Sequence, residues 1–375
     1  MITIFGTKMI KNWDYTDEYE SHREEILKIV DSVFSSGRLI LGSRVEQFEN
    51  AFSSYCSVDY GVGVNSGTDA LFLALKTLGI GSGDEVITVS NTAVPTVAAI
   101  RATGAVPVFV DVEEDAFLMD INKIESAITP RTRCIMPVHL FGQPVDMAPL
   151  VDIAKRHYLK VVEDCAQAAG ALYKGRKVGS FGEIGAFSFY PTKILGAYGD
   201  GGMTVTNERG LYEKLKRLRF YGMEKDYYSE EEGYNSRLDE VQAAILNFKL
   251  KTLDESVLKR RKIAEIYSKE LSSVGDIELP IIKQGRTHQF HLYTIKTSYR
   301  DTIMAYLREN GIETRINYPT PIHLMRGYGF LGYKKGDLPV TERLVTRILS
   351  LPMYPGVSAN DIDKVVSSIR NFFKK

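Results

Sequence analysis

Apolar and polar positions divide the chain into a regularly alternating part and a more helical part. Between residues 60 and 206, short β-branched runs predict strands at 85–89, 106–110, 133–138, 160–163 and 185–190. The segments between them have helical spacing and predict helices at 69–78, 95–103, 120–128 and 147–156. This alternation predicts βαβ units, and therefore an α/β fold with a mainly parallel central sheet flanked by helices. In such sheets, ligands bind beyond the carboxyl ends of the strands.

After residue 206 the pattern changes to charged amphipathic helices, predicted at 210–220 and, as one long helix, at 236–271. A strand at 291–297 and helices at 301–310 and 359–372 then predict a smaller α+β unit. We therefore expect a large domain at residues 1–255 and a small C-terminal domain at residues 256–375. The acidic segment 227–233 (YYSEEEG) is the best candidate for a mobile surface loop.

The composition excludes several classes of function. The 375 residues are 44% hydrophobic, and 47 Lys and Arg balance 47 Asp and Glu, so the formal net charge is zero. A dedicated nucleic-acid binder would need a basic excess. Cys56, Cys134 and Cys165 lack metal-ligand spacing and predict neither disulfides nor a metal site. Because no segment resembles a secretory leader or a membrane span, we expect a cytoplasmic protein that binds no membrane.

The segment VNSGTDALF is a candidate anion site. It places Ser66, Gly67 and Thr68 directly before an apolar helix. Small residues let a ligand approach the backbone, and the free N–H groups of the first helical turn attract phosphate or carboxylate. An ordinary helix N-cap would explain the same residues.

Two further segments place charged side chains at predicted strand ends. LKVVEDCAQAAG ends a strand at Glu163 and Asp164, with Gln167 three residues beyond, although an acid here could simply cap a helix. In GAFSFYPTKILGAYGDGG, a strand leads into Lys193 and a glycine-rich stretch. A lysine among apolar and aromatic groups has a lowered pKa and can attack an aldehyde.

These three features together predict a site for pyridoxal phosphate (PLP). The phosphate needs backbone amides and hydroxyls, the ring nitrogen needs a negative partner, and the aldehyde needs an amine. The helix start at Ser66–Thr68, the carboxylate of Asp164 and the amine of Lys193 meet these needs. Each signal is weak alone, and their order and spacing carry the prediction.

Longer motifs resemble the DegT/DnrJ/EryC1/StrS sugar aminotransferases, which have the aspartate aminotransferase fold (fold type I of PLP enzymes). The resemblance spans nearly the whole chain, in SSGRLILGSRVEQFENAF, NSGTDALFLAL, GAVPVFVDV, PVHLFGQPVDM, EDCAQAAGA, FSFYPTK and GYNSRLDEVQAAIL. It implies PLP-dependent transamination of a nucleotide-linked keto sugar, with L-glutamate as the usual amino donor. It also implies a homodimer.

The resemblance assigns roles to individual residues. Lys193 would form the imine with the cofactor, Asp164 would pair with its ring nitrogen, and Gln167 would contact the face bearing its phenolic oxygen. The phosphate would be held by Gly67, Thr68 and Ser188. An asparagine at the position of Asn235 reaches the partner subunit's cofactor phosphate, so the active sites would be shared between subunits.

Two segments, SNTAVPTVAAI and RINYPTPIHL, are most similar to enzymes that aminate C3 of dTDP-3-keto-6-deoxyhexoses. In that branch, residues like Tyr190, Asn317 and Tyr318 line the sugar pocket. Histidine is common where this chain has Asn317, and an amide cannot shuttle protons as an imidazole does. Such a role would therefore fall to Lys193, Tyr190 or Tyr318, or be absent.

The cofactor ring presents a second departure from the family pattern. Many relatives stack an aromatic side chain on the ring from the segment 90–94, where this chain has Asn91 and Ala93. The sequence therefore names no stacking residue. The C3-aminating branch tends to have a similarly small residue, which favours that assignment slightly.

The histidines predict no metal site. His288 and His291 lie three residues apart in an apparent strand, so their side chains would face opposite sides. His139 follows a buried strand, and we interpret it as structural. His323, in YPTPIHL, is a candidate substrate contact, with a structural role as the equal alternative.

Other functions remain as alternatives. A 4-keto sugar 4-aminotransferase fits the same motifs. A C3 dehydratase of the family would have histidine instead of Lys193, and a desulfurase would need a reactive loop cysteine. A PLP-fold regulatory protein would normally carry an added DNA-binding element. The downstream pathway, whether lipopolysaccharide O-antigen, S-layer glycan or antibiotic sugar, stays open.

Overall fold

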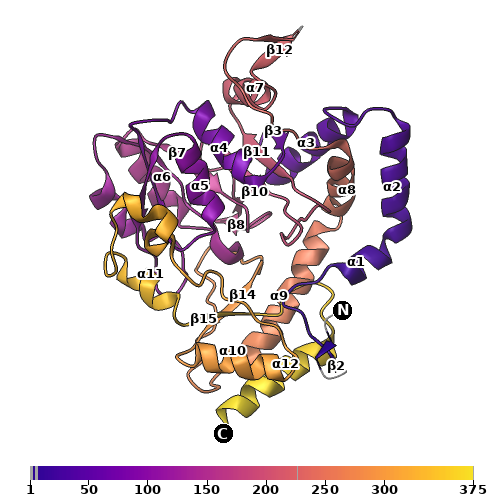
Figure 1. The fold of residues 1–375 in the computed structure, drawn as a ribbon, viewed down its shortest axis with the longest axis vertical. Coiled ribbons are helices and arrows are strands. Elements are labelled where there is room, and N and C mark those ends of the chain that lie inside the picture. The colour runs from indigo at the N-terminus through magenta and orange to yellow at the C-terminus, as the bar shows by residue number, and fades with distance from the viewer. Residues whose placement is uncertain (1–2, 5–6, 226, 375) are drawn as a thin grey trace.

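The computed structural model describes residues 3–4, 7–225 and 227–374 (Figure 1). Its centre is a seven-stranded sheet with the strand order β3-β11-β10-β7-β6-β4-β5. β11 runs antiparallel to both of its neighbours, and the other adjacent pairs are parallel. The strands are β3 (Tyr60–Val64), β4 (Glu85–Val89), β5 (Val106–Val110), β6 (Thr132–Ile135), β7 (Lys160–Asp164), β10 (Ile184–Ser188) and β11 (Gly202–Thr206). The predicted α/β fold with a mainly parallel sheet is confirmed.

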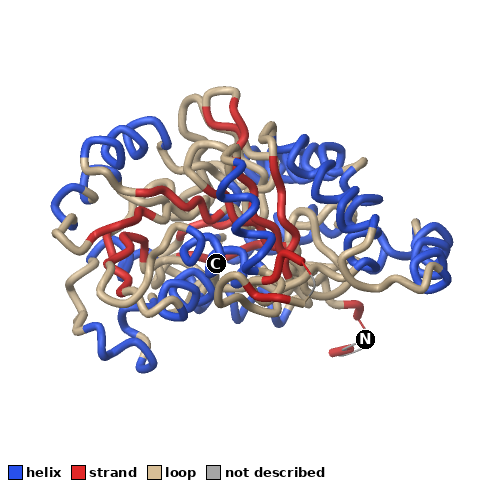
Figure 2. The backbone as a smooth tube through the Cα atoms, turned by 90° about the horizontal axis from the view of Figure 1, so that it is seen from above, coloured by secondary structure: helices blue, strands red, loops and turns tan. Residues whose placement is uncertain are grey.

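Helices surround this sheet, and Figure 2 shows the strands in the middle of the molecule. Central strands such as β4 and β11 are buried along their whole length, because side chains on both of their faces are covered. The surrounding helices are α3 (Ser43–Cys56), α4 (Gly67–Thr77), α5 (Val94–Ala102), α6 (Met147–Arg156) and α7 (Arg209–Leu218). Four of the predicted helices, at 69–78, 95–103, 147–156 and 210–220, are thereby confirmed to within two residues.

The single helix predicted for residues 120–128 is wrong. The segment forms two short 3-10 helices, η1 (Ile121–Lys123) and η2 (Glu125–Ala127). Its apolar side chains recur every three residues, which matches the three residues per turn of a 3-10 helix. Ile124 is fully buried in an apolar cluster, and Ile121 and Ala127 pack against the same cluster.

The long helix predicted for residues 236–271 is also wrong, because the chain forms α8 (Glu240–Leu250) and α9 (Leu253–Glu270). Thr252, between them, has non-helical backbone angles. Leu246 of α8 packs in the cluster around α3, together with Leu253 and Val257 from the first turns of α9. Further along α9, Ile263 and Tyr267 pack in the C-terminal cluster. α9 therefore connects the two cores, and the break lies before its first turn.

The C-terminal part forms the predicted smaller α+β unit. Its strands β14 (Tyr293–Lys296) and β15 (Ile348–Leu351) pair antiparallel, beside α10 (Arg300–Glu309), α12 (Ala359–Phe373) and α9. Ile10 near the N-terminus pairs with Ile312 and is buried in the same core. Both ends of the chain thus contact this unit, as Figure 1 also shows. The division of the chain at residue 255 stays a prediction.

The remaining elements are short, apart from α2. They are β1 (Thr3–Ile4), β2 (Thr7–Lys8), α1 (Thr16–Ser21), α2 (Arg23–Ser35), η3 (Leu140–Gly142), β8 (Leu172–Tyr173), β9 (Arg176–Lys177), β12 (Met223–Lys225), β13 (Tyr228–Ser229), η4 (Ile322–Leu324), η5 (Arg326–Leu331) and α11 (Pro339–Leu344). The predicted mobile segment 227–233 belongs to the β12–β13 hairpin, which protrudes in Figure 1 and exposes Tyr227 and Tyr228. Its mobility stays a prediction. In the described ranges, every helix is too short or too polar to cross a lipid bilayer.

Candidate active site

Asp164 ends β7 at the carboxyl edge of the sheet, as the sequence predicts. It lies opposite Ala186 of the parallel strand β10, and its side chain is almost fully buried. One carboxylate oxygen accepts a hydrogen bond from the Thr96 hydroxyl at 2.8 Å, and the other accepts the Ala166 N–H at 3.1 Å. The carboxylate is therefore held in one orientation by two donors.

Lys193 lies in the loop that follows β10 at the same edge. The N–H of Lys193 donates to the Tyr190 carbonyl at 2.8 Å, which closes a tight turn. The loop then folds back, and a Cβ added to Gly196 would lie 2.4 Å from the Pro191 carbonyl oxygen. Only glycine allows this close approach, so the glycine-rich stretch after Lys193 fixes the shape of the loop.

Lys193 and Asp164 influence each other's ionisation. Burial lowers the pKa of Lys193 to about 8, while the charge of Asp164 acts in the opposite direction. Burial also raises the pKa of Asp164, against hydrogen bonds from Thr96 and Ala166 and the charge of Lys193. At a pKa of about 8, roughly one in ten Lys193 amines is uncharged at pH 7. The predicted lowering of the lysine pKa is confirmed, and the amine is suited to nucleophilic attack.

The candidate anion site lies at the start of α4. The Ser66 hydroxyl caps this helix by accepting the Asp69 N–H at 3.1 Å, so the N-cap interpretation is correct for Ser66. The N–H groups of Gly67 and Thr68 also belong to this first turn, where no partner exists inside the helix. A Cβ on Gly67 would lie 2.5 Å from the Ser188 Cβ. Gly67 therefore lies against Ser188 at the end of β10, and Thr68 follows Gly67 in the same helical turn.

Gln167 joins the sheet edge to the C-terminal unit. Its amide nitrogen donates to the Tyr318 hydroxyl at 3.1 Å, and its amide oxygen accepts the Phe141 N–H at 2.7 Å. Burial raises the pKa of Tyr318 to about 12, and Asp164 contributes to this increase. Tyr318, Gln167 and Asp164 therefore lie close together at this edge of the sheet.

The predicted site residues Asn317, Tyr190 and Asn235 differ in how far they are exposed and in their hydrogen-bond partners. Asn317 precedes Tyr318, and its side-chain oxygen is buried without a hydrogen-bond partner among the described residues. Tyr190, in the Lys193 loop, is about half exposed. Asn235 is also exposed and pairs through its backbone with Phe220. Its contact with a partner subunit stays a prediction.

His323 is buried, and both of its ring nitrogens already have partners. Nδ1 lies 2.8 Å from the Ser90 hydroxyl, and Nε2 lies 3.1 Å from a Glu342 carboxylate oxygen. These contacts fit the structural alternative and leave no free ring nitrogen for a sugar. A direct substrate contact of His323 stays untested.

Glu163 and Asp164 are neighbours in sequence, but their side chains have separate roles because successive strand residues face opposite sides. Glu163 is fully buried and accepts the N–H groups of Gly179, Phe181 and Gly182. His139 bonds to the same carboxylate at 3.1 Å, which confirms its structural interpretation. These donors keep the pKa of Glu163 below its ordinary value although burial raises it. Of these two acids, only Asp164 has a carboxylate that is left to contact a ligand.

Two residues at the site were not predicted from the sequence. Thr96 in the first turn of α5 binds Asp164, and only its position shortly after a strand end could have indicated it. His291 is buried, and its Nδ1 has no hydrogen-bond partner among the described residues. Burial holds the pKa of His291 well below its ordinary range, and the nearby positive charge of Lys193 adds to this effect.

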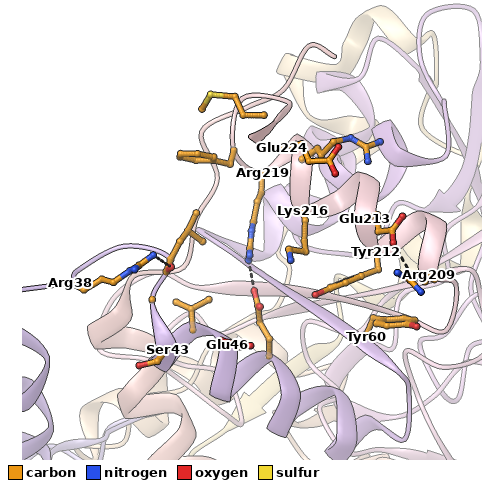
Figure 3. Close-up of a pocket in the computed structure, with 17 residues that line it drawn as sticks. Arg38, Ser43, Glu46, Tyr60, Arg209, Tyr212, Glu213, Lys216, Arg219 and Glu224 are labelled. Carbon is orange, nitrogen blue, oxygen red and sulfur yellow. Dashed lines mark hydrogen bonds and ion pairs between the residues drawn. The ribbon is translucent and has the colours of Figure 1, made fainter. Parts of the chain in front are cut away.

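A separate groove of about 1090 Å³ lies between α3 and α7, and none of the predicted site residues lines it. Figure 3 shows Arg219 between the two helices and Tyr60 beside Tyr212. Arg219 forms a buried ion pair with Glu49, and Tyr60 stacks on Tyr212 with ring centres 4.7 Å apart. The candidate active site is therefore not this groove.

The site fits pyridoxal phosphate on structural grounds. The lowered pKa of Lys193 suits attack on the aldehyde. Burial raises the pKa of Asp164, and a protonated ring nitrogen beside it would supply the positive charge that stabilises its carboxylate. The N-terminus of α4 suits the phosphate. This fold and site define a PLP enzyme.

Comparison with known proteins agrees. The DegT/DnrJ/EryC1/StrS aminotransferase family matches residues 20–370. A dTDP-3-amino-3,4,6-trideoxy-alpha-D-glucose transaminase from Micromonospora megalomicea subsp. nigra is 50% identical, over 96% of this chain and 97% of that protein. The crystal structure of S. venezuelae DesV has a TM-score of 0.96 at 43% identity, over 98% of this chain and 100% of that chain. NtdA from Bacillus subtilis with bound PMP has a TM-score of 0.89 at 34% identity, over 95% and 82% of the two chains.

The chain therefore belongs to the DegT/DnrJ/EryC1/StrS aminotransferase family. It is a PLP-dependent aminotransferase of nucleotide sugars, with the fold expected from its sequence. Among the alternatives raised by the sequence, a dehydratase and a desulfurase do not agree with this class.

Proposed function

We propose that this enzyme aminates C3 of a nucleotide-linked 3-keto-6-deoxyhexose, with dTDP as the nucleotide and L-glutamate as the amino donor. The main support is the 50% identity, over nearly the whole chain, to a transaminase named for a dTDP-3-amino sugar. The Lys193–Asp164 site supports transamination, and the half-buried residues Asn317 and Tyr318, which Gln167 joins to the same sheet edge, support sugar binding beside it.

Each predicted residue has a role in this proposal. Lys193 would hold the cofactor covalently, Asp164 would pair with its ring nitrogen, and Gln167 would contact its phenolic oxygen. The phosphate would be held by Gly67, Thr68 and Ser188, together with Asn235 of the partner subunit in a homodimer. Tyr190, Asn317 and Tyr318 would bind the sugar, and His323 would support their loop or touch the sugar.

When bound, PLP supplies the electron sink through which the amino group passes from donor to sugar. Lys193 would remove the proton from the α-carbon of the donor and return a proton to the sugar carbon. Its pKa of about 8 suits both tasks near neutral pH, because charged and uncharged forms are both available. Asp164, which is 4% exposed, would keep its negative charge beside the ring nitrogen.

The regiochemistry of the product tests this proposal. The enzyme would be incubated with PLP, L-glutamate and either a dTDP-3-keto or a dTDP-4-keto 6-deoxyhexose, and the products would be analysed by NMR. We expect an amino group at C3 and little turnover of the 4-keto sugar. Amination at C4 would support the alternative 4-aminotransferase and reject our assignment.

The three buried, free cysteines are compatible with the cytoplasmic location that we also propose.

A further inference from the structure

Asp164 is held by a chain of two buried hydroxyl groups. The Thr96 hydroxyl donates to Asp164 at 2.8 Å, and the hydroxyl oxygens of Thr92 and Thr96 lie 2.9 Å apart. Thr96 has a single hydroxyl proton, which points at Asp164, so Thr92 is the donor in the second pair. Thr92, Thr96 and Asp164 are all at most 4% exposed, which protects this chain of hydrogen bonds from water.

The loop that carries Thr92 is fixed by the C-terminal unit. The His323 ring lies between two partners, with Nε2 3.1 Å from a Glu342 carboxylate oxygen and Nδ1 2.8 Å from the Ser90 hydroxyl. The N–H of His323 donates to the Ser90 hydroxyl at 3.0 Å, and the N–H of Ile322 donates to the Ser90 carbonyl at 3.2 Å. These bonds hold Ser90 two residues before Thr92.

Hydrogen bonds to Asp164 decide where a shared proton lies. A carboxylate and a ring nitrogen that face each other can share one proton, and donors to the carboxylate favour its charged form. The proton then stays on the ring nitrogen, where it makes the ring a stronger electron acceptor. Without such donors, burial favours a neutral carboxylic acid and an uncharged ring.

We propose that Thr96 is a positioning residue that keeps Asp164 charged and the cofactor ring nitrogen protonated, with Thr92 supporting it. This inference rests on the proposed function, in which Asp164 pairs with that nitrogen. Thr96 touches neither cofactor nor substrate in this account. It acts through the carboxylate that it binds.

To test this, the Thr96 hydroxyl is removed by substitution and the protonation of the PLP ring nitrogen is measured by 15N NMR. Thr96→Val removes the donor, Thr96→Ser retains it, and each holoenzyme is loaded with PLP labelled with 15N in the ring. Thr77→Val is the matched control, because Thr77 is a buried helical threonine whose hydroxyl has no partner among the described residues. Thr92→Val tests the supporting bond if Thr96→Val does not fold.

In Thr96→Val we expect the 15N shift to move toward that of an unprotonated ring, and kcat to fall about tenfold with little change in KM. Thr96→Ser and Thr77→Val should match the wild type, and Thr92→Val should show a smaller shift in the same direction. A ring nitrogen that stays protonated in Thr96→Val would overturn this inference but not the proposed function. If Thr96→Val does not fold, an unchanged 15N shift in Thr92→Val would overturn it in the same way. An unprotonated nitrogen in the wild-type enzyme would instead reject the proposed role of Asp164.

Discussion

Gln167 donates a hydrogen bond of 3.1 Å to the hydroxyl of Tyr318, a residue 151 positions further along the chain. Gln167 follows β7 of the central sheet, whereas Tyr318 belongs to the segment after α10. The site is thus formed by both parts of the molecule, and this bond connects them beside Asp164.

Removing the Tyr318 hydroxyl should weaken this connection. We expect Tyr318→Phe to lower the free energy of unfolding by about 1 kcal/mol, because the Gln167 amide loses a buried partner. Urea denaturation would measure the change. Tyr158→Phe is the control, because Tyr158 is 95% exposed and its replacement should have no effect. Equal stabilities for both variants would contradict the importance of the Gln167–Tyr318 bond.

The adjacent acids Glu163 and Asp164 should respond differently to loss of charge. Asp164→Asn should fold normally but lose nearly all turnover, since the cofactor ring loses its negative partner. Glu163→Gln places an amide donor among three backbone N–H donors, so it should lower stability by about 3 kcal/mol. Thermal unfolding and transaminase assays on both variants would measure this. A stable, active Glu163→Gln enzyme would show that those donors do not require a carboxylate.

The lowered pKa of Lys193 predicts a specific pH dependence of cofactor attachment. Only the uncharged amine attacks an aldehyde, and its fraction rises from roughly one tenth at pH 7 to about half at pH 8. The rate of PLP addition to the cofactor-free enzyme, followed by absorbance, should therefore rise about fivefold over this interval and level off above pH 9. A rate that keeps rising tenfold per pH unit up to pH 10 would indicate an ordinary lysine.

Shared active sites predict complementation between two impaired variants. In the proposed dimer, Lys193→Ala destroys a subunit's own site, whereas Asn235→Ala weakens the site of its partner. A mixed dimer therefore contains one intact site. When equal amounts are unfolded and refolded together, about half of the dimers are mixed, and about one quarter of wild-type activity should return. No recovery, with mixed dimers confirmed by mass spectrometry, would place Asn235 outside the partner's site.

The sequence predicted the mainly parallel sheet and the place of Lys193 and Asp164 at its carboxyl edge, because these features follow from local rules. Strand and helix alternate in the first half, and the carboxyl ends of parallel strands meet at one edge. Lys193 and Asp164 each lie at or just after such an end. The chemistry of the pair is what the family resemblance implies, and it stays a prediction.

Features that depend on tertiary contacts could not be predicted. The break between α8 and α9 lies in a segment whose sequence reads as one amphipathic helix, and α9 packs its first turns in the core of α8 and its later turns in the C-terminal core. The bonds from Thr96 to Asp164 and from His323 to Ser90 join residues 68 and 233 positions apart. No local pattern indicates such pairs.

Lys193 is the amine that we propose carries the cofactor. Borohydride reduction of the PLP-loaded enzyme, followed by proteolysis and mass mapping of the labelled peptide, tests this most directly. We predict a single reduced pyridoxyl group on the side chain of Lys193. A label on another lysine, or no label on an enzyme that remains active with PLP, would contradict it.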